Sequence, residues 1–600
     1  MRILRPGRSL LPALCCGLFL GCSAPPAQEL ADTLIFTESG QVVGVSSEHP
    51  VVRWRDIPYA RPPVAELRWR APQPLVGAAQ ERIAPSESDI LCPQEPGEIS
   101  GTDDDGFVGQ EDCLYLDIVA PEDYTRKAYP VMFWIHGGGN TSGHKGTYDY
   151  SALAARENVV VVTINYRLGP LGWFTHPALE KSAAGYDRSG NFGTLDIIAA
   201  LEWTQRNIAA FGGDPDNVTI FGESAGGRNV YSMLASPLAE GLFHKAIAQS
   251  PTAQSYSPEQ AYNADQQFSN LDRGSWEVLK ELGKDNDRVG AEELRGLSVQ
   301  TLLGAYYGID KDHAEPLIVN DGEVIPEEGL LAALANPAYA KHVPVMAGSN
   351  RDEVTLWLGL NRYFVDADDV LFGVLPPKLR VREPDLFGYW VEQRGRGWKV
   401  RSVDRALTNL EAAGYSDLYA YRFDWDEQAD NWFVPFSQVL GAAHASEIAF
   451  VMGAPMYGSV GEYMYPDTDS AGAMTEIMMS AWAQFARSGK PGSVADTSWP
   501  VFTAAQPDVM VLDAGADSVK VLRDSPGLDG LLTEIAETAS PLSDLETCML
   551  VWELVTTVGD AAYDEYRQWN NGSCASVDVP EEKAAVRAAL TEKYGSPDVL

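Results

Sequence analysis

Four short apolar runs along the chain predict strands that are buried on both faces. They cover residues 131–135, 159–164, 218–221 and 343–347, and most of their side chains are large and apolar. A fifth segment, 418–423, alternates Tyr and Phe with other residues, as a strand would. Strands buried on both faces are typical of a parallel sheet that helices cover.

Helical patterns separate these predicted strands. Residues 195–210 carry apolar side chains at helical spacing and stop at a Gly-Gly pair, and residues 474–487 form an amphipathic pattern that ends at Gly489. The alternation of strands and helices predicts an α/β fold with a large, mostly parallel central sheet flanked by helices. Ligands of such sheets bind beyond the carboxyl ends of the strands.

The other segments predict additions to this core. Residues 33–55 alternate like a small antiparallel ribbon, whereas residues 256–330 and 360–415 are polar-patterned and predict helical insertions that cap the sheet. The main domain is therefore expected to span 31–540, and residues 541–600 form a C-terminal extension.

One motif within this framework carries chemistry. The 218–221 strand leads into Gly-Glu-Ser-Ala-Gly at 222–226, and a helical pattern follows. Strand, tight turn and helix form the context in which Gly-x-Ser-x-Gly is a nucleophile elbow, with Gly222 and Gly226 allowing the turn and Ser224 at its tip. The start of the following helix would face any anion formed there.

A reactive serine needs a base, an acid that orients the base, and donors for an oxyanion. In this type of site the chain order is serine, acid, histidine. Of eight histidines, only His444 both follows Ser224 at a distance and lies in a loop after a predicted strand. Asp352 and Glu353 both follow the 343–347 strand, and spacing alone leaves the choice of acid open.

Glycines supply the expected oxyanion donors. A Gly-Gly-Gly sequence at 137–139 follows the 131–135 strand directly, and residues without a side chain let backbone N–H groups approach a ligand.

The charge balance narrows the range of partners. The 600 residues carry a formal net charge of −39. This excess of acidic residues disfavours binding to nucleic acid and to anionic lipid, because both are negatively charged and bind to basic protein surfaces.

The N-terminal residues predict export. Arginines at positions 2, 5 and 8 precede an apolar stretch, and Leu-Gly-Cys at 20–22 is typical of a bacterial lipoprotein cleavage site, so residues 1–22 would be a signal peptide and Cys22 a lipidated N-terminus. An ordinary secretory signal is the alternative. Residues 23–30 would form a polar tether, and the lipid would be the only membrane attachment.

Four cysteines remain after the signal segment. An even number in an exported chain predicts disulfides, and the spacing favours Cys92–Cys113 and Cys548–Cys574. A metal site is not expected, because no Cys-x-x-Cys or paired histidines accompany them.

Several short segments between Gly40 and about Trp499 give the chain a family resemblance. They are Ile-Pro-Tyr-Ala at 57–60, Glu-Asp-Cys-Leu-Tyr-Leu at 111–116, His-Gly-Gly-Gly at 136–139, Asn-Tyr-Arg at 165–167, Gly-Asn at 190–191, Phe-Gly-Gly-Asp-Pro at 211–215, the elbow at 222–226, Asn-Arg-Asp-Glu at 350–353 and His-Ala-Ser-Glu at 444–447. With them the chain resembles the type-B carboxylesterases, an α/β-hydrolase family that also contains the cholinesterases.

This resemblance implies roles for individual residues. Ser224 would be the nucleophile, His444 the base and Glu353, rather than Asp352, the acid. The oxyanion hole would be formed by the N–H groups of three residues: Gly138, Gly139 and Ala225. Two buried carboxylates, Glu223 and Glu447, would lie near the histidine, and Cys92–Cys113 would be the family's first disulfide. No cofactor or metal is implied, and the substrate would be a small-molecule ester.

Two positions depart from the family pattern and are candidate substrate contacts. Asn140 stands where the family usually has Phe, which predicts a more polar pocket wall, and Arg228 replaces a small residue four positions after the serine. A buried guanidinium must be paired, so Arg228 is expected either to meet an acidic side chain behind the site or to hold a substrate carboxylate.

The sequence leaves some alternatives open. Because the segment between Cys92 and Cys113 lacks the tryptophan with which cholinesterases bind choline, we expect a general carboxylesterase. An amidase or carbamate hydrolase would use the same triad. A non-catalytic binding protein is the third possibility, although all triad members are present.

Overall fold

The architecture is taken from a computed structural model. The structure describes residues 28–599 apart from 76, 78, 79, 87, 98–105, 269–273, 310–314, 371–374, 515–518 and 524. The signal segment, Cys22 and residues 23–27 of the predicted tether lie outside the described residues. Residues 28–30 are not a free tether, because Ser46 N–H bonds to Gln28 O and Leu30 N–H bonds to Gly44 O, both at 2.9 Å.

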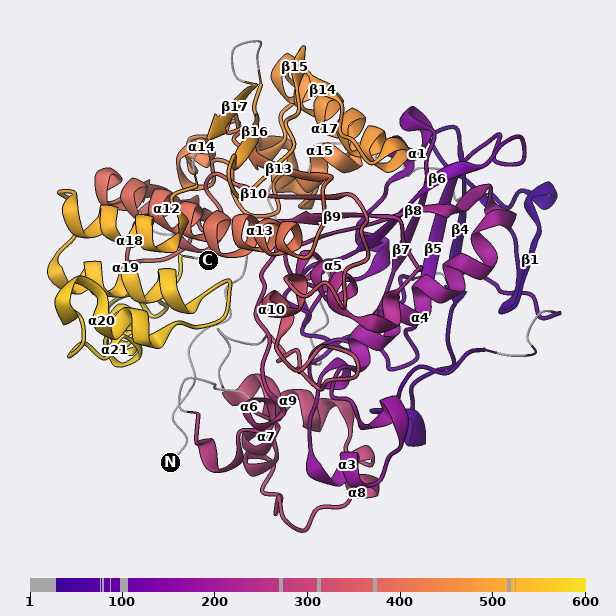
Figure 1. The fold of residues 1–600 in the computed structure, drawn as a ribbon, viewed down its shortest axis with the longest axis horizontal. Coiled ribbons are helices and arrows are strands. Elements are labelled where there is room, and N and C mark those ends of the chain that lie inside the picture. Colours follow the sequence, from indigo (N-terminus) through magenta and orange to yellow (C-terminus); the bar gives the residue numbers. More distant parts are fainter. Residues whose placement is uncertain are drawn as a thin grey trace.

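A single large sheet organises the described part of the chain (Figure 1). Its eleven strands follow the order β17-β16-β13-β10-β9-β8-β6-β7-β5-β4-β3, parallel from β16 to β7 and antiparallel at both edges. The strands are β3 (Val45–Ser46), β4 (Val51–Pro58), β5 (Tyr115–Pro121), β6 (Tyr129–Ile135), β7 (Val160–Ile164), β8 (Gly213–Glu223), β9 (Lys245–Gln249), β10 (Val345–Asn350), β13 (Leu418–Phe423), β16 (Asp508–Leu512) and β17 (Lys520–Arg523). All five predicted strands are confirmed.

Helices cover both faces because alternate side chains of each central strand point to opposite sides. In β6, Val131 and Phe133 belong to one apolar core, whereas Met132 and Trp134 belong to the other. The first core includes α4 (Phe192–Asn207), α5 (Ala225–Ala235), α10 (Leu330–Leu334) and α13 (Arg405–Ala412), and the second includes α1 (Ser151–Glu157), α15 (Ile448–Met452) and α17 (Asp469–Ser488). The helices predicted at 195–210 and 474–487 are α4 and α17.

The predicted insertions are only partly as expected. The described part of residues 256–330 contains the helices α6 (Pro258–Tyr262), α7 (Ser275–Glu281), α8 (Ala291–Arg295) and α9 (Val299–Ile309). Residues 360–415 were expected to be mostly helical, and they begin with an antiparallel hairpin of β11 (Val365–Val370) and β12 (Leu375–Val381) that was not predicted. Val365, Leu379 and Val381 are buried from it, while charged side chains alternate with them, so the period is that of a strand. Helix α12 (Pro384–Trp398) and a π-helix (Lys399–Asp404) follow.

The C-terminal extension forms a helical unit at one end of the molecule, drawn yellow in Figure 1. It contains α19 (Asp544–Thr556), α20 (Tyr563–Gly572) and α21 (Val579–Tyr594), and α18 (Gly527–Glu537) precedes it in the chain. These helices share a third apolar core with α12. The predicted disulfide between Cys548 and Cys574 is present within this core.

Short elements complete the chain. They are α2 (Gly169–Gly172), α3 (Pro177–Lys181), α11 (Thr355–Leu358), α14 (Phe436–Val439), α16 (Gly461–Met464), β14 (Ser493–Val494), β15 (Thr497–Ser498), and the β1 (Ile35–Thr37) and β2 (Gly40–Val42) hairpin. That hairpin and the β3–β4 pair confirm the predicted ribbon at 33–55.

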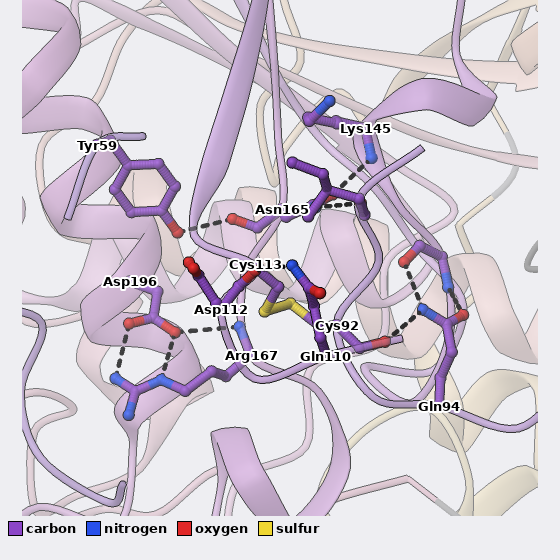
Figure 2. The surroundings of a disulfide bond; sticks show 12 residues. Tyr59, Cys92, Gln94, Gln110, Asp112, Cys113, Lys145, Asn165, Arg167 and Asp196 are labelled. Atoms are coloured by element: carbon purple, nitrogen blue, oxygen red, sulfur yellow. Dashed lines mark hydrogen bonds and ion pairs between the residues drawn. A yellow bond between two sulfur atoms is a disulfide. The ribbon is translucent and has the colours of Figure 1, made fainter. Parts of the chain in front are cut away.

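The predicted disulfide Cys92–Cys113 is also present, and its surroundings are shown in Figure 2. Two residues after Cys92, the Gln94 amide accepts from Gly143 N–H at 2.9 Å and donates to Gly143 O at 3.2 Å. Gly143 ends the loop that begins at the glycines after β6, so the disulfide segment braces that loop.

Candidate active site

The elbow around Ser224 has the predicted form. Strand β8 ends at Glu223, Ser224 has φ 59° and ψ −123°, and α5 begins at Ala225. A side chain on Gly222 would put its Cβ 2.6 Å from Ile135 O, and one on Gly226 would come within 2.0 Å of the same atom. Only glycine fits at these two positions, and the strained backbone of Ser224 is therefore held by its neighbours.

His444 and Glu353 meet although they lie far apart in the sequence. Glu353 follows β10, and His444 lies in the loop between β13 and α15. His444 Nδ1 is 2.6 Å from Glu353 Oε2, both side chains are buried, and Asn350 N–H donates to Glu353 Oε1 at 2.8 Å. Nδ1 therefore faces a fixed acceptor, which leaves Nε2 as the nitrogen available for chemistry.

Asp352 has other partners. Its carboxylate accepts from Arg351 Nη2 at 2.6 Å and from Ala442 N–H at 2.9 Å. Glu353 therefore contacts the imidazole, whereas Asp352 ties the His444 loop to the end of β10.

The opposite edge of the His444 ring faces Glu223. His444 Nε2 lies 3.1 Å from Glu223 Oε1, but the contact lacks hydrogen-bond geometry, and among the described residues Nε2 has no hydrogen-bond partner. Because Ser224 is the next residue after Glu223, the imidazole lies beside the elbow.

Glu447 is the third buried carboxyl group of this cluster. It accepts from Asn350 Nδ2 at 2.7 Å and from Gln249 Nε2 at 3.1 Å. Gln249 O in turn accepts from Ser224 N–H at 2.9 Å. Glu447 thus contacts Asn350 at the end of β10 directly and is linked to the elbow through Gln249.

Burial and mutual charge shift the protonation of this cluster. Burial and the nearby carboxylates raise the pKa of Glu223 to about 8 against the opposing charge of His444. Burial also raises the pKa of Glu447. Burial by itself lowers the pKa of His444, but the charges of Glu223 and Glu353 outweigh it and raise the pKa to about 9. Glu223 and His444 therefore titrate as a coupled pair.

The glycine loop after β6 packs directly on the elbow. A Cβ on Gly137 would lie 3.1 Å from Ser224 Cβ, and Gly138 and Gly139 have φ of 86° and 61°. The adjacent His136 is fully buried, stacks on Tyr166 with ring centroids 4.4 Å apart, and has a pKa that burial lowers to about 3. A neutral ring thus anchors the loop, which brings backbone rather than side chains to the serine.

The side chain of Asn140 is held from inside the protein. It is fully buried, and Oδ1 accepts from Asn229 Nδ2 at 2.9 Å and from Tyr166 O–H at 3.2 Å. Nδ2 has no hydrogen-bond partner among the described residues. The more polar pocket wall expected at this position stays a prediction.

Arg228 has the acidic partner that its burial requires. Its Nη2 lies 3.0 Å from Glu315 Oε2; the arginine side chain is 1% exposed and the glutamate side chain 49%. The pairing expected for Arg228 is confirmed, but Glu315 is half in solvent rather than buried behind the site.

Two tryptophans beside His444 were not singled out from the sequence. Trp357 and Trp398 stack with centroids 6.0 Å apart, and both rings lie against the imidazole, at 5.2 and 5.0 Å. Trp398 is buried, but Trp357 is 50% exposed. The one signal for Trp357 was its position four residues after Glu353; Trp398 gave none.

The C-terminal extension reaches this site. Ala253 N–H donates to Val558 O at 2.7 Å, and Arg401 Nη1 donates to Leu554 O at 3.0 Å. Trp398, just before the π-helix that carries Arg401, donates from Nε1 to Pro251 O at 3.0 Å. The extension thus holds the two segments that carry Trp398 and the residues following β9.

Among the described residues, no cluster of His, Cys, Asp and Glu side chains has an arrangement that could hold a metal ion. Within the same residues, no helix is long and apolar enough to cross a membrane.

The sheet order and the elbow define an α/β-hydrolase fold, and the site is that of a carboxylic ester hydrolase. A model of the carboxylesterase family matches residues 31–369 and 400–525, and the chain belongs to that family.

Relatives and solved structures agree with this assignment. The para-nitrobenzyl esterase of Bacillus subtilis is 33% identical over 505 residues, covering 80% of this chain and 95% of the relative. The fumonisin B1 esterase of Sphingopyxis macrogoltabida is 33% identical over 517 residues, covering 80% and 87%. A solved PNB esterase superposes with a TM-score of 0.62 at 30% identity, over 82% of this chain and 97% of the other. A Geobacillus stearothermophilus carboxylesterase gives 0.63 at 29%, over 82% and 98%.

Proposed function

We propose that the protein hydrolyses small carboxylic esters through an acyl-enzyme formed on Ser224. The observation that carries this proposal is the 2.6 Å contact between His444 Nδ1 and Glu353 Oε2, beside a serine on a strained elbow. A serine, an imidazole and an orienting carboxylate in these relative positions are the parts that acyl transfer requires.

The reaction proceeds in two halves. His444 Nε2 takes the proton of Ser224 as the serine oxygen bonds to the ester carbon, while Glu353 keeps Nδ1 protonated and oriented. The tetrahedral oxyanion accepts from the N–H groups of Gly138, Gly139 and Ala225, and each such donor contributes about 2.7–4 kcal/mol in comparable sites. The alcohol leaves with the proton from His444, and water then releases the acid by the same route.

A fluorophosphonate probe tests the nucleophile. It phosphonylates a serine that a neighbouring base activates, so peptide mapping is expected to find the label on Ser224 and nowhere in Ser224→Ala. Labelling at another serine, or none in protein that unfolds cooperatively, would refute the proposal. Turnover of matched ethyl esters and N-ethyl amides with the same acyl groups then separates an esterase from an amidase.

We also propose that the chain is exported and anchored through Cys22. Two disulfides support an oxidising compartment. Radiolabelled palmitate supplied to the native host is expected to label the wild type but not Cys22→Ser. A secreted, unlabelled wild-type protein would point to an ordinary signal peptide.

A further inference from the structure

The Arg228–Glu315 pair lies beside the proposed oxyanion hole. Arg228 is one helical turn after Ser224, and its N–H donates to Ser224 O at 3.0 Å. A Cβ on Gly139 would lie 3.3 Å from Glu315 Cγ and 3.6 Å from Glu315 Oε1. The carboxylate of Glu315 therefore occupies space next to the glycine backbone that faces the substrate.

The pair leaves the guanidinium incompletely satisfied. Nη2 lies 3.0 Å from Glu315 Oε2, but among the described residues neither Nη2 nor Nε has a partner with hydrogen-bond geometry. A guanidinium presents a planar fork of donors that matches a carboxylate in a two-point contact. Arg228 is almost fully buried, so N–H donors of its guanidinium that lack a hydrogen-bond partner lower the stability of the protein.

The partner, by contrast, is easily replaced. Glu315 is 49% exposed, so its carboxylate can return to water at little cost, and half-exposed ion pairs contribute little to stability. Its removal would leave a buried cation that only another anion can balance. The buried tyrosines nearby supply no such anion, since burial raises the pKa of Tyr256 to about 12 despite the charge of Arg228.

We propose that Arg228 selects esters whose acyl part carries a second carboxylate, and that this carboxylate replaces Glu315 on the guanidinium. The inference rests on the proposed ester hydrolysis at Ser224 and names its substrate class: half-esters of short dicarboxylic acids. The exchange conserves charge, because one anion leaves Arg228 as another arrives. Glu315 then acts as a stand-in that keeps Arg228 neutralised between turnovers.

The test compares two substrates that differ in one charge. Monoethyl succinate carries the second carboxylate, and ethyl levulinate carries a methyl ketone of the same shape. The readout is the ratio of their kcat/KM values at moderate salt. Arg228→Met is expected to lower this ratio about tenfold or more, as expected when a buried charge loses its partner. Glu315→Gln is expected to raise it about threefold or more, since the competing anion is gone.

A matched control separates this effect from a change in net charge. Glu38 pairs with Arg206 at 2.9 Å on the surface, and Glu38→Gln removes the same single negative charge. Its ratio is expected to stay within about twofold of the wild type, because exposed charges are screened beyond about 8 Å. If Arg228→Met does not fold, Arg228→Lys, which keeps the charge but loses the fork, takes its place with a smaller expected drop.

The outcomes divide cleanly. If neither Arg228→Met nor Glu315→Gln changes the ratio, or if both lower it, the pair is structural and the inference is overturned while ester hydrolysis stands. If the wild type cleaves neither these two esters nor a panel of simple esters, the proposed function itself fails.

Discussion

Glu223 Oε1 and His444 Nε2 lie 3.1 Å apart, while Nδ1 of the same ring contacts Glu353 at 2.6 Å. The imidazole is thus enclosed between two carboxyl groups. Burial lowers its pKa, but these charges raise it to about 9. Because a general base must be neutral to accept a proton, catalysis is expected to increase as pH rises through a pKa above the ordinary value of about 6.5 for histidine.

Glu223→Gln is expected to move the acid limb of the pH profile, in which kcat/KM rises with pH, to lower pH. The amide keeps the shape of the side chain but removes the negative charge that favours the imidazolium, so the pKa of His444 falls. The measurement is log(kcat/KM) for a neutral ester between about pH 5 and 10. Glu537→Gln on the exposed face of α18 is the control. A limb that stays in place or moves to higher pH would contradict the coupling.

Glu353→Gln is expected to reduce kcat by about 10⁴-fold, as when the equivalent acid of a serine triad is amidated. Asp352→Asn changes the neighbouring acid in the same way but only weakens the contacts to Arg351 and Ala442, so its effect on kcat is expected to be far smaller. Steady-state kinetics on both purified variants decide the matter, and the reverse ranking would give the acid role to Asp352.

Trp357→Ala is expected to lower kcat/KM for benzyl acetate about three- to tenfold more than for ethyl acetate. Its half-exposed ring lies beside His444, where an aromatic leaving group can stack, and such contacts contribute about 0.5–1.5 kcal/mol. Trp357→Phe should retain most of the preference. Trp432→Ala removes a 60% exposed tryptophan that meets Phe433 edge to face instead and serves as control. Equal losses for both esters would leave Trp357 only a packing role.

Lys145→Met is expected to destabilise the protein by about 3–5 kcal/mol, because it leaves two buried carboxylates without a counter-charge. Lys145 Nζ lies 2.6 Å from Asp56 and 2.8 Å from Asp117, and it is fully buried. Lys284→Met breaks a half-exposed pair with Glu293 and is expected to change stability by less than about 1 kcal/mol. Urea unfolding measures both, and similar midpoints would refute the argument.

The sequence predicted the parts of the site that depend on local pattern. The strand, the glycines and the helix around Ser224 form one continuous segment, so the elbow could be predicted from the sequence. His444 emerged by elimination, because chain order and a preceding strand constrain the base. The acid could not be identified by elimination, because Asp352 and Glu353 are adjacent and only the loop geometry decides which of them contacts the imidazole.

Contacts between segments that are distant in the sequence could not be predicted from it. Glu315 follows Arg228 by 87 residues, and nothing in the neighbouring sequence indicates a partner. Trp398 ends a helix in a region that was predicted to be mostly helical, and the hairpin of β11 and β12 in that region was not predicted. The direction of the Asn140 side chain depends on Tyr166 and Asn229, whose places the pattern does not give.

The contacts between the C-terminal extension and the site have a consequence for the order in which the chain is made. Ser224, Glu353 and His444 are all synthesised before Val558, whose carbonyl fixes Ala253, and before Leu554, whose carbonyl holds Arg401. A growing chain therefore carries all three residues of the proposed triad before the C-terminal helices that hold the segment of Trp398 have been made. Full activity is expected to appear only after the last helices have emerged and Cys548 has met Cys574, which delays ester cleavage until the chain is complete.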